Sequence, residues 1–225
     1  MTTAVDIVIP TLNAGGSLES TLAALPAHPE LVFSTTICDG GSRDDTIAIA
    51  RRAGAAVVTA ARGRGNQLAA GAAAGRAPWL LFLHADTRLQ SGAGKVIARF
   101  VRSIDRKAGY FRLRFDADEA GARRVERLAA WRCRSLGLPY GDQGLLISRA
   151  HYEGLGGFRP LPLMEDVDLV RRIGRKNLVP LEADALTSAA RYRRGGWLLR
   201  PLRNLTCLTL YFAGLPPQTL RRIYG

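Results

Sequence analysis

Residues 5–13 read VDIVIPTLN, and residues 37–46 read ICDGGSRDDT. Each segment begins as an apolar run and ends in polar and glycine residues. Apolar strands that alternate with helices are typical of a parallel sheet that is covered on both faces. In such sheets, ligands bind beyond the carboxyl ends of the strands. The residues that directly follow each strand are therefore the first candidates for a site.

The same alternation extends through the N-terminal half of the chain. The pattern predicts strands over 5–10, 31–38, 55–59 and 79–83. It predicts helices over 17–25, 42–52 and 65–75, with Ser17 and Ser42 as caps of the first two. We therefore expect an α/β fold, with a Rossmann-like, mostly parallel sheet flanked by helices.

The pattern is less regular in the second half. Helices are predicted over 93–102, 122–136 and 165–172, an edge or antiparallel strand over 108–115, and a short strand over 145–148. We find no linker and no internal repeat. We expect one domain over 1–225, with a nucleotide-binding half (1–90), an acceptor half (91–195) and a helical basic tail (196–225).

Composition limits the class of protein. The chain has 225 residues, of which 47% are hydrophobic and 23% charged, as in an ordinary soluble globular protein. Its three cysteines are far apart, which excludes a disulfide scaffold and a cysteine zinc site and suits a reducing compartment. The first ten residues, MTTAVDIVIP, lack the features of a signal peptide, so we expect a cytoplasmic protein.

The net charge of +13 favours anionic partners. Residues 185–225 contain seven arginines and no acidic residue, but few aromatic residues, so we expect no nucleic-acid partner. Apolar residues three or four positions apart would share one helix face: Leu198, Leu202, Leu205, Leu208 and Phe212. That face would dock on an anionic membrane, on the protein's own core or on a second subunit of a homo-oligomer, and the sequence leaves these alternatives open.

Two carboxylates follow predicted strands of the N-terminal half. Asp39 follows the strand over 31–38, and Asp86 lies three residues after the strand over 79–83. Such carboxylates accept hydrogen bonds from a base or ribose, or hold a divalent metal against a diphosphate. The structural alternatives are a turn at Asp39 and a helix N-cap at Asp86.

Two further segments carry charge in a suggestive pattern. Residues 62–67, RGRGNQ, combine glycines that permit close backbone approach with arginines that suit phosphate, although a plain basic loop would look the same. Residues 164–169, MEDVDL, place three carboxylates within four positions. A helix N-terminus tolerates that clustering without any chemistry, and a carboxylate in a partly dry cleft also serves as a general base.

These segments, in this order, resemble the family 2 glycosyltransferases with the GT-A fold, from residue 6 to about residue 192. The resemblance rests on residues 7–13 (IVIPTLN), 38–46 (CDGGSRDDT), 82–86 (FLHAD), 156–158 (GGF) and 165–169 (EDVDL). It implies an inverting transfer from a nucleotide-diphosphate sugar to an acceptor. Asp39 then falls at the aspartate that pairs with a uracil-type base, Asp86 in the metal segment, and Asp166 at the catalytic base.

The resemblance also implies the remaining site residues. The expected donor-binding residues are Pro10, Thr11, Asn13, Asp39, Arg62, Arg64, Asn66, Gln67 and Asp86. The expected residues on the acceptor or sugar side are Asp142, Gln143 and Glu165. Asp86 is the expected ligand of a divalent metal, Mg²⁺ or Mn²⁺, and the expected donor is a UDP-sugar.

Residues 63–67, 140–143 and 162–166 are similar to a short bacterial subgroup that includes enzymes named as carotenoid-acid glycosyltransferases. That name implies a lipid-like acceptor with a hydroxyl or carboxylate. The basic tail described above would place the protein at the inner face of the cell membrane if it docks on lipid. The chain departs from the family pattern at Cys38 and His84, which replace aspartates, and no histidine follows His151 to act as a further metal ligand.

Two other functions stay open from the residues alone. A sugar-phosphate nucleotidyltransferase would use the same sheet edge, but it normally carries a lysine after the first strand, where this chain reads NAGGS over 13–17. A non-catalytic module that binds anions or membranes would need only the basic tail. Release of pyrophosphate or of nucleoside diphosphate separates the two enzymes.

Overall fold

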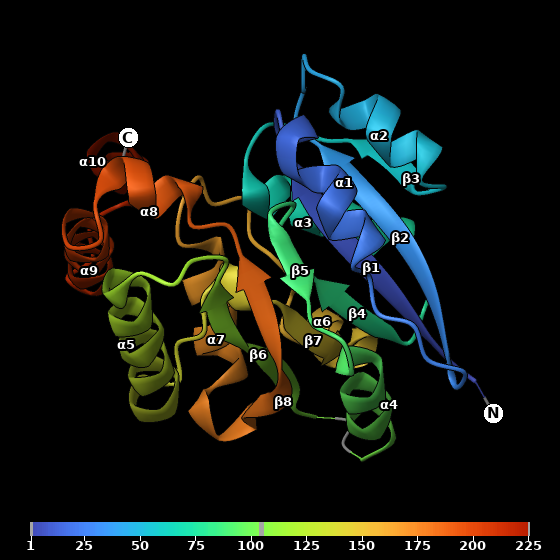
Figure 1. Cartoon of the computed structure of the whole chain (residues 1–225). Coiled ribbons are helices and arrows are strands. Elements are labelled where there is room, and N and C mark those ends of the chain that lie inside the picture. The colour runs from blue at the N-terminus through green and yellow to red at the C-terminus, as the bar shows by residue number, and fades with distance from the viewer. Residues whose placement is uncertain (1, 104–105, 225) are drawn as a thin grey trace.

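The computed structural model describes residues 2–103 and 106–224 (Figure 1). The strands are β1 (Thr3–Thr11), β2 (Leu31–Asp39), β3 (Ala56–Thr59), β4 (Trp79–Phe82), β5 (Thr87–Leu89), β6 (Ala108–Phe115), β7 (Leu145–Ser148) and β8 (Leu178–Thr187). The α-helices are α1 (Gly15–Ala23), α2 (Thr46–Arg52), α3 (Arg64–Ala74), α4 (Ala93–Ser103), α5 (Ala120–Leu136), α6 (Arg149–Gly154), α7 (Glu165–Ile173), α8 (Ala190–Gly195), α9 (Leu199–Phe212) and α10 (Pro217–Tyr224). Short 3₁₀ turns lie over Gly141–Gln143 and Arg175–Asn177.

The strands form one sheet in the order β3-β2-β1-β4-β7-β6-β8-β5. β1 is parallel to β2 and β4, and β2 is parallel to β3, which confirms the parallel N-terminal half. For residues 108–115 we predicted an edge or antiparallel strand, and the second alternative is confirmed by the pairing with β7. β6 lies inside the sheet, antiparallel to β7 and parallel to β8.

Alternate residues of the central strands enter two different cores. Val5, Ile7 and Ile9 of β1 pack in a cluster that includes residues of α1, α2 and α4. Val8 points to the other face, into a cluster with residues of α3 and α7. Because both faces are covered by helices, as Figure 1 shows, the strands read as nearly continuous apolar runs.

Both predicted serine caps are wrong. α1 begins at Gly15, two residues before Ser17, because Thr46 Oγ1 accepts from Ala14 N at 2.8 Å and Asp44 Oδ2 from Gly15 N at 2.9 Å. α2 begins at Thr46 instead of Ser42. The Ser42 hydroxyl instead accepts from Asn13 N at 2.8 Å, so the loop between β2 and α2 is tied to the loop after β1.

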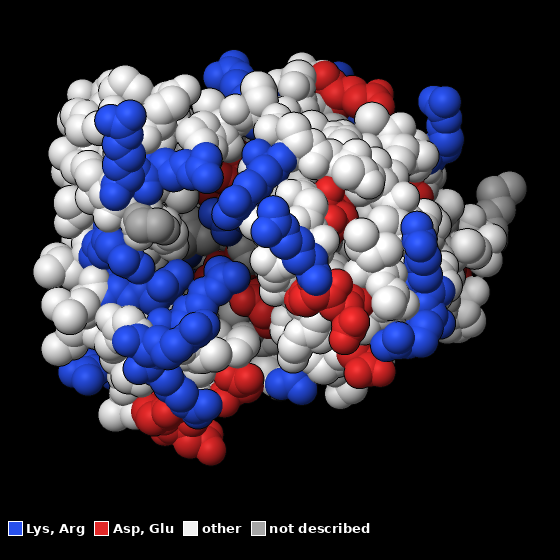
Figure 2. Space-filling view, turned by 90° about the horizontal axis from the view of Figure 1, so that it is seen from above, with Lys and Arg blue, Asp and Glu red and all other residues white. Residues whose placement is uncertain are grey.

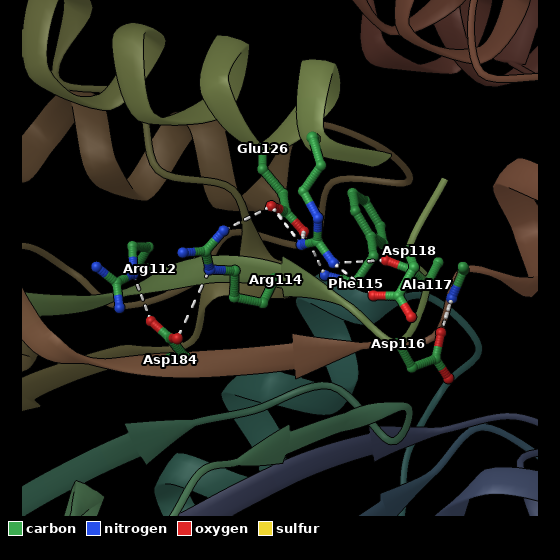
Figure 3. A network of polar contacts seen from close by, with 10 residues as sticks. Arg112, Arg114, Phe115, Asp116, Ala117, Asp118, Glu126 and Asp184 are labelled. Atoms are coloured by element: carbon green, nitrogen blue, oxygen red, sulfur yellow. Dashed lines mark hydrogen bonds and ion pairs between the residues drawn. The ribbon is translucent and has the colours of Figure 1, made fainter. Parts of the chain in front are cut away.

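Helix α5 is fastened to β6 by one buried carboxylate, Glu126 (Figure 3). Glu126 accepts from Phe115 N at 2.9 Å, from Arg114 at 2.8 Å and from Arg123 at 2.6 and 2.8 Å. Burial raises the pKa of Glu126, but these hydrogen bonds outweigh burial and hold its pKa below the ordinary value. Glu126 therefore couples the helix to the strand most strongly while it is ionised.

We expect Glu126→Ala to lower the free energy of unfolding at neutral pH by about 3 kcal/mol, since Phe115 N and two guanidinium groups would lose their acceptor. The folded pKa lies below the unfolded one, so the contribution of Glu126 is complete above the unfolded pKa and is lost as the pH falls through the folded pKa. Urea unfolding should therefore show a difference between the two proteins that is constant near neutral pH and shrinks below about pH 4.

The control for this prediction is Glu126→Gln, which keeps one oxygen for Phe115 N. Glu126→Gln should lower the free energy of unfolding at neutral pH by less than Glu126→Ala does. The difference in free energy of unfolding between the two variants should not change with pH, because neither side chain titrates. A stability difference between wild type and Glu126→Ala that grows on acidification would contradict the assignment.

The C-terminal helices pack on the end of α7. Leu208 and Leu220 are buried in a cluster with Leu163, Met164 and Val167. The predicted tail helix is confirmed as α9, but of its apolar stripe only Leu208 faces this core. No helix within the described parts of the chain is long and apolar enough to cross a membrane.

Candidate active site

Two adjoining cavities open at the carboxyl ends of β1 and β4. The larger, of about 450 Å³, is lined by the loop after β1 and by Arg62 and Gln67. The smaller, of about 100 Å³, is lined by Tyr140, Asp142 and Asp166. Both share the following residues: Arg64, His84, Asp86, Arg191 and Tyr224. Seen from above, Figure 2 shows Lys and Arg side chains gathered around a hollow on the side of the C-terminal helices, with acidic side chains beside it.

Asp39 lies behind the lining of the larger cavity, where it is bonded to the lining residue Thr11. It is 1% exposed, and its carboxylate accepts from Gly41 N at 2.9 Å, Ser42 N at 2.8 Å and Thr11 Oγ1 at 3.0 Å. Burial raises its pKa, but these bonds and that of the Ser42 hydroxyl lower it overall. These contacts agree with the structural alternative, in which Asp39 forms the turn after β2. Thr11, which donates to Asp39, lines the cavity itself. The role of Asp39 in base binding stays a prediction.

The loop after β1 reaches the larger cavity as predicted. Pro10, Thr11 and Asn13 all line it. Asn13 has a left-handed backbone, with φ 50°, and its Oδ1 accepts from Arg43 N at 2.9 Å. This conformation turns the chain from β1 into α1 and leaves the cavity open at the strand end.

The predicted basic loop contributes unequally. Arg62 and Arg64 line the larger cavity, and Gln67 also helps to form the floor, since its Nε2 donates to Thr11 O at 2.6 Å and Cys38 O at 2.7 Å. Asn66 is half-buried, and its amide donates weakly to Arg62 O at 3.5 Å. The lack of a side chain at Gly65 is required, because a Cβ there would lie 2.3 Å from Arg159 O.

Asp86 and His84 stand where the two cavities meet. The Asp86 carboxylate lies 3.7 Å from the Arg191 guanidinium, which comes from α8. Burial lowers the pKa of His84 to about 4, so its imidazole is neutral at physiological pH. Among the residues that the structure describes, no three His, Cys, Asp or Glu side chains are grouped to hold a metal. A metal at the junction of the two cavities would therefore have Asp86 as its carboxylate ligand from this loop.

Asp166 lies in the first turn of α7 and lines the smaller cavity. Its Oδ2 accepts from Gly141 N at 2.8 Å and its Oδ1 from Val167 N at 2.8 Å. These two bonds hold the carboxylate in one orientation. The neighbouring Glu165 lies outside both cavity linings, and its buried carboxylate forms an ion pair, at 2.7 Å, with the partly exposed Arg64.

The two residues predicted beside Asp166 differ in their surroundings. Asp142 lines the smaller cavity, and its Oδ1 is buried without a hydrogen-bond partner in the described residues. Burial raises its pKa to about 6. Gln143 is a scaffold residue: it accepts from Arg132 at 3.0 Å and donates to Phe111 O at 3.0 Å, beneath the 3₁₀ turn.

Sequence reasoning missed the contribution of the C-terminal tail to the site. Arg191 and Tyr224 line both cavities, Arg221 the larger, and Arg200 and Asn204 the smaller. The excess of arginine in this segment was the available signal. From the sequence we expected this segment to dock on an anionic membrane, on the protein's own core or on a second subunit, and not to line the site. The direction in which a helix turns its polar face depends on packing, which the spacing of residues alone does not reveal.

Three curated relatives match this chain with the same sequence identity and coverage. An uncharacterized glycosyltransferase of Mycobacterium bovis and two of Mycobacterium tuberculosis strains are each 35% identical over 108 residues. The match covers 47% of this chain and 48% of each relative. The aligned part thus spans about half the length of these proteins.

Solved structures share the fold at low identity. Glucosyl-3-phosphoglycerate synthase from Mycobacterium tuberculosis, solved with Mn²⁺, UDP and glucosyl-3-phosphoglycerate, is 22% identical with a TM-score of 0.56 over 83% of this chain and 70% of that one. Staphylococcus aureus TarS (residues 1–349) is 14% identical with a TM-score of 0.62 over 100% of this chain and 69% of that one.

The family model described as "Glycosyl transferase family 2" matches residues 6–141, more than half of the chain. That range contains the loops after β1, β2 and β4 and most of the lining of the larger cavity, whereas most of the lining of the smaller cavity, including Asp166, lies beyond it. Together with the GT-A arrangement of the sheet, this match confirms the resemblance seen in the sequence. The chain belongs to glycosyl transferase family 2.

Proposed function

We propose that this protein is an inverting glycosyltransferase that moves a sugar from a nucleotide-diphosphate sugar to a hydroxyl or carboxylate of an acceptor. We propose a UDP-sugar as the donor. One observation carries the proposal: Asp86 and Asp166 line a single cavity that joins an arginine-lined one at the strand ends. The larger cavity, built chiefly by residues 1–90, suits the nucleotide and diphosphate. The smaller, with Asp142 and Asp166, suits the transferred sugar and acceptor.

A divalent cation, Mg²⁺ or Mn²⁺, fits the chemistry of this site. Asp86 supplies a carboxylate oxygen beside a cavity large enough for a diphosphate, and the neutral His84 adds no positive charge to that of the nearby Arg191. The similar glucosyl-3-phosphoglycerate synthase was solved with Mn²⁺ or Mg²⁺ together with UDP. When bound, the cation would neutralise charge on the diphosphate, with phosphate oxygens and water completing its ligands.

The chain's own groups account for the rest of the reaction. The acceptor oxygen forms a bond to the anomeric carbon as the bond from that carbon to the diphosphate oxygen breaks. Asp166 takes the proton of an acceptor hydroxyl, and the bonding electron pair leaves with the nucleoside diphosphate. Arg64 and Arg191, which border both cavities, stabilise the developing negative charge on the leaving group.

We expect Arg191→Ala to weaken donor binding and turnover by about 10- to 100-fold, as for loss of one charge-assisted contact to a phosphate. Arg191→Lys should recover part of the loss, since it keeps the charge but not the fork of donors. The measurements are initial rates and thermal shifts over a donor titration. Arg194→Ala is the matched control, because Arg194 is exposed and outside the cavity linings. Equal losses in both variants would remove Arg191 from the site.

The subgroup resemblance leads us to propose a lipid-like acceptor, presented at the inner face of the cytoplasmic membrane. The basic C-terminal helices support this, since they border the acceptor side of the site and carry the arginines of the tail. The identity of the sugar follows from the experiment below.

The function is tested with a thermal-shift panel of nucleotide sugars, with and without Mn²⁺, followed by product analysis with the donor that binds. We expect one donor to give a metal-dependent shift, and nucleoside diphosphate to appear as the released product. Pyrophosphate release with a sugar phosphate and nucleotide would instead identify a nucleotidyltransferase. The absence of any nucleotide-sugar shift would reject both.

A further inference from the structure

Helix α9 turns its apolar side to the solvent. Leu198, which precedes it, and Leu202 and Leu205 within it are 69%, 60% and 58% exposed. Leu199 and Phe212 extend the same face and are also exposed. Leu199, Leu202 and Leu205 follow one another at intervals of three residues, and Phe212 lies two helical turns beyond Leu205, so these side chains lie on the outer side of the helix. We call these five residues the α9 stripe.

The opposite side of the same helix faces the protein. Cys207 and Leu208 are buried there in the cluster on α7, while Arg200 and Asn204 line the smaller cavity and the Arg203 guanidinium lies 5.1 Å from the centre of the Tyr224 ring. The helix is thus already packed on the protein through this side. The exposed leucines on its outer side are not needed for that packing and are available to a partner.

The charges around the stripe decide what kind of partner fits. Residues 185–225 carry seven arginines and no acidic residue. Arg194, Arg221 and Arg222 of this segment are exposed. A second copy of this chain, with a net charge of +13, would bring arginine against arginine. An anionic lipid surface instead offers acyl chains for the stripe and phosphates for the arginines.

We propose that the α9 stripe inserts into the interfacial region of an anionic bilayer, with α9 parallel to the membrane plane. The polar face of α9 would then lie over the acceptor cavity, and the apolar face in the lipid. This places the acceptor cavity directly behind a membrane-bound helix. If the proposed function holds, on which this step rests, the acceptor is a molecule that is itself anchored in the membrane.

The test is flotation of the full chain with vesicles of phosphatidylcholine alone or with phosphatidylglycerol added. We expect at least about ten-fold more binding to the anionic vesicles, decreasing with salt. Leu202→Ser/Leu205→Ser should lower binding to the anionic vesicles by at least about ten-fold. Val32→Ser, which removes an equally exposed apolar side chain from β2, is the matched control and should bind as wild type.

Three results would overturn the proposal: no binding to anionic vesicles, equal binding by the double-serine variant, or a stable dimer in sedimentation that the double-serine variant dissociates. The donor-induced thermal shift in the absence of vesicles separates this proposal from the proposed function. It should be the same in the double-serine variant and wild type, because Leu202 and Leu205 lie outside the cavity linings. Lost flotation with an intact donor shift supports this inference, whereas vesicle binding without any donor shift rejects the glycosyltransferase function alone.

Discussion

Asp166→Asn is expected to lower turnover by about a thousand-fold, while donor binding changes by less than about two-fold. The amide has nearly the same shape as the carboxylate and keeps one oxygen to accept from Gly141 N or Val167 N. It has no basic oxygen for the proton of the acceptor. The loss should therefore appear in the rate of nucleoside diphosphate release at saturating donor, with little change in the donor-induced thermal shift.

Asp142 provides the matched control, because it is the other carboxylate on the acceptor side of the smaller cavity. Burial raises its pKa to about 6, and Asp166 and Asp86 are close enough to contribute to that shift. We expect Asp142→Asn to retain at least about a tenth of wild-type turnover. If it loses more than Asp166→Asn does, the role of general base belongs to Asp142 and our assignment is wrong.

The N-terminal half of the fold could be predicted because its signals are local. The strands over 3–11, 31–39 and 79–82 are mostly apolar, and the first two are each followed by residues that suit a loop and a helix. Their parallel pairing follows from the helical crossovers between them. The errors lay at the helix starts, where side chains from a neighbouring loop cap the first turn instead of the expected serines.

The second half was harder because its strands depend on distant partners. β5 has only three residues and pairs with β8 about a hundred positions later, where Thr87 and Thr187 place their hydroxyls 3.0 Å apart. β8 itself, over 178–187, has no clear alternation in the sequence and was not predicted. Without β8, the sequence could not show that β6 is an interior strand.

The candidate site was predicted to the extent that it follows from strand ends. That rule placed Asp86 at the meeting point of the cavities, and the acidic segment placed Asp166 there. It also suggested that Asp39 would line the same crevice, whereas Asp39 is buried one layer behind, bonded to Thr11 and to its own loop. Strand position alone does not reveal which way a side chain points once a loop folds back over it.

Asp86→Ala is expected to remove the metal-dependent part of donor binding and to lower turnover by about 100- to 1,000-fold. The reason lies in the charges at this position. Without a cation, the Asp86 carboxylate repels a diphosphate and also holds Arg191, whose guanidinium is 3.7 Å away. Removing Asp86 would release Arg191 to the diphosphate and would remove the repulsion.

The structure thus predicts that the order of donor affinity between wild type and Asp86→Ala reverses when the metal is removed. With a chelator present, Asp86→Ala should bind donor at least as tightly as wild type, whereas with Mn²⁺ wild type should bind more tightly. Donor titrations followed by thermal shift, in Mn²⁺ and in chelator, measure the donor affinity of each protein in each condition. Asp45→Asn, which changes an exposed carboxylate away from the cavities, should match wild type in each condition. If Asp86 instead only accepts a hydrogen bond from the donor, Asp86→Ala will bind more weakly in both conditions, and the metal-ligand assignment will be wrong.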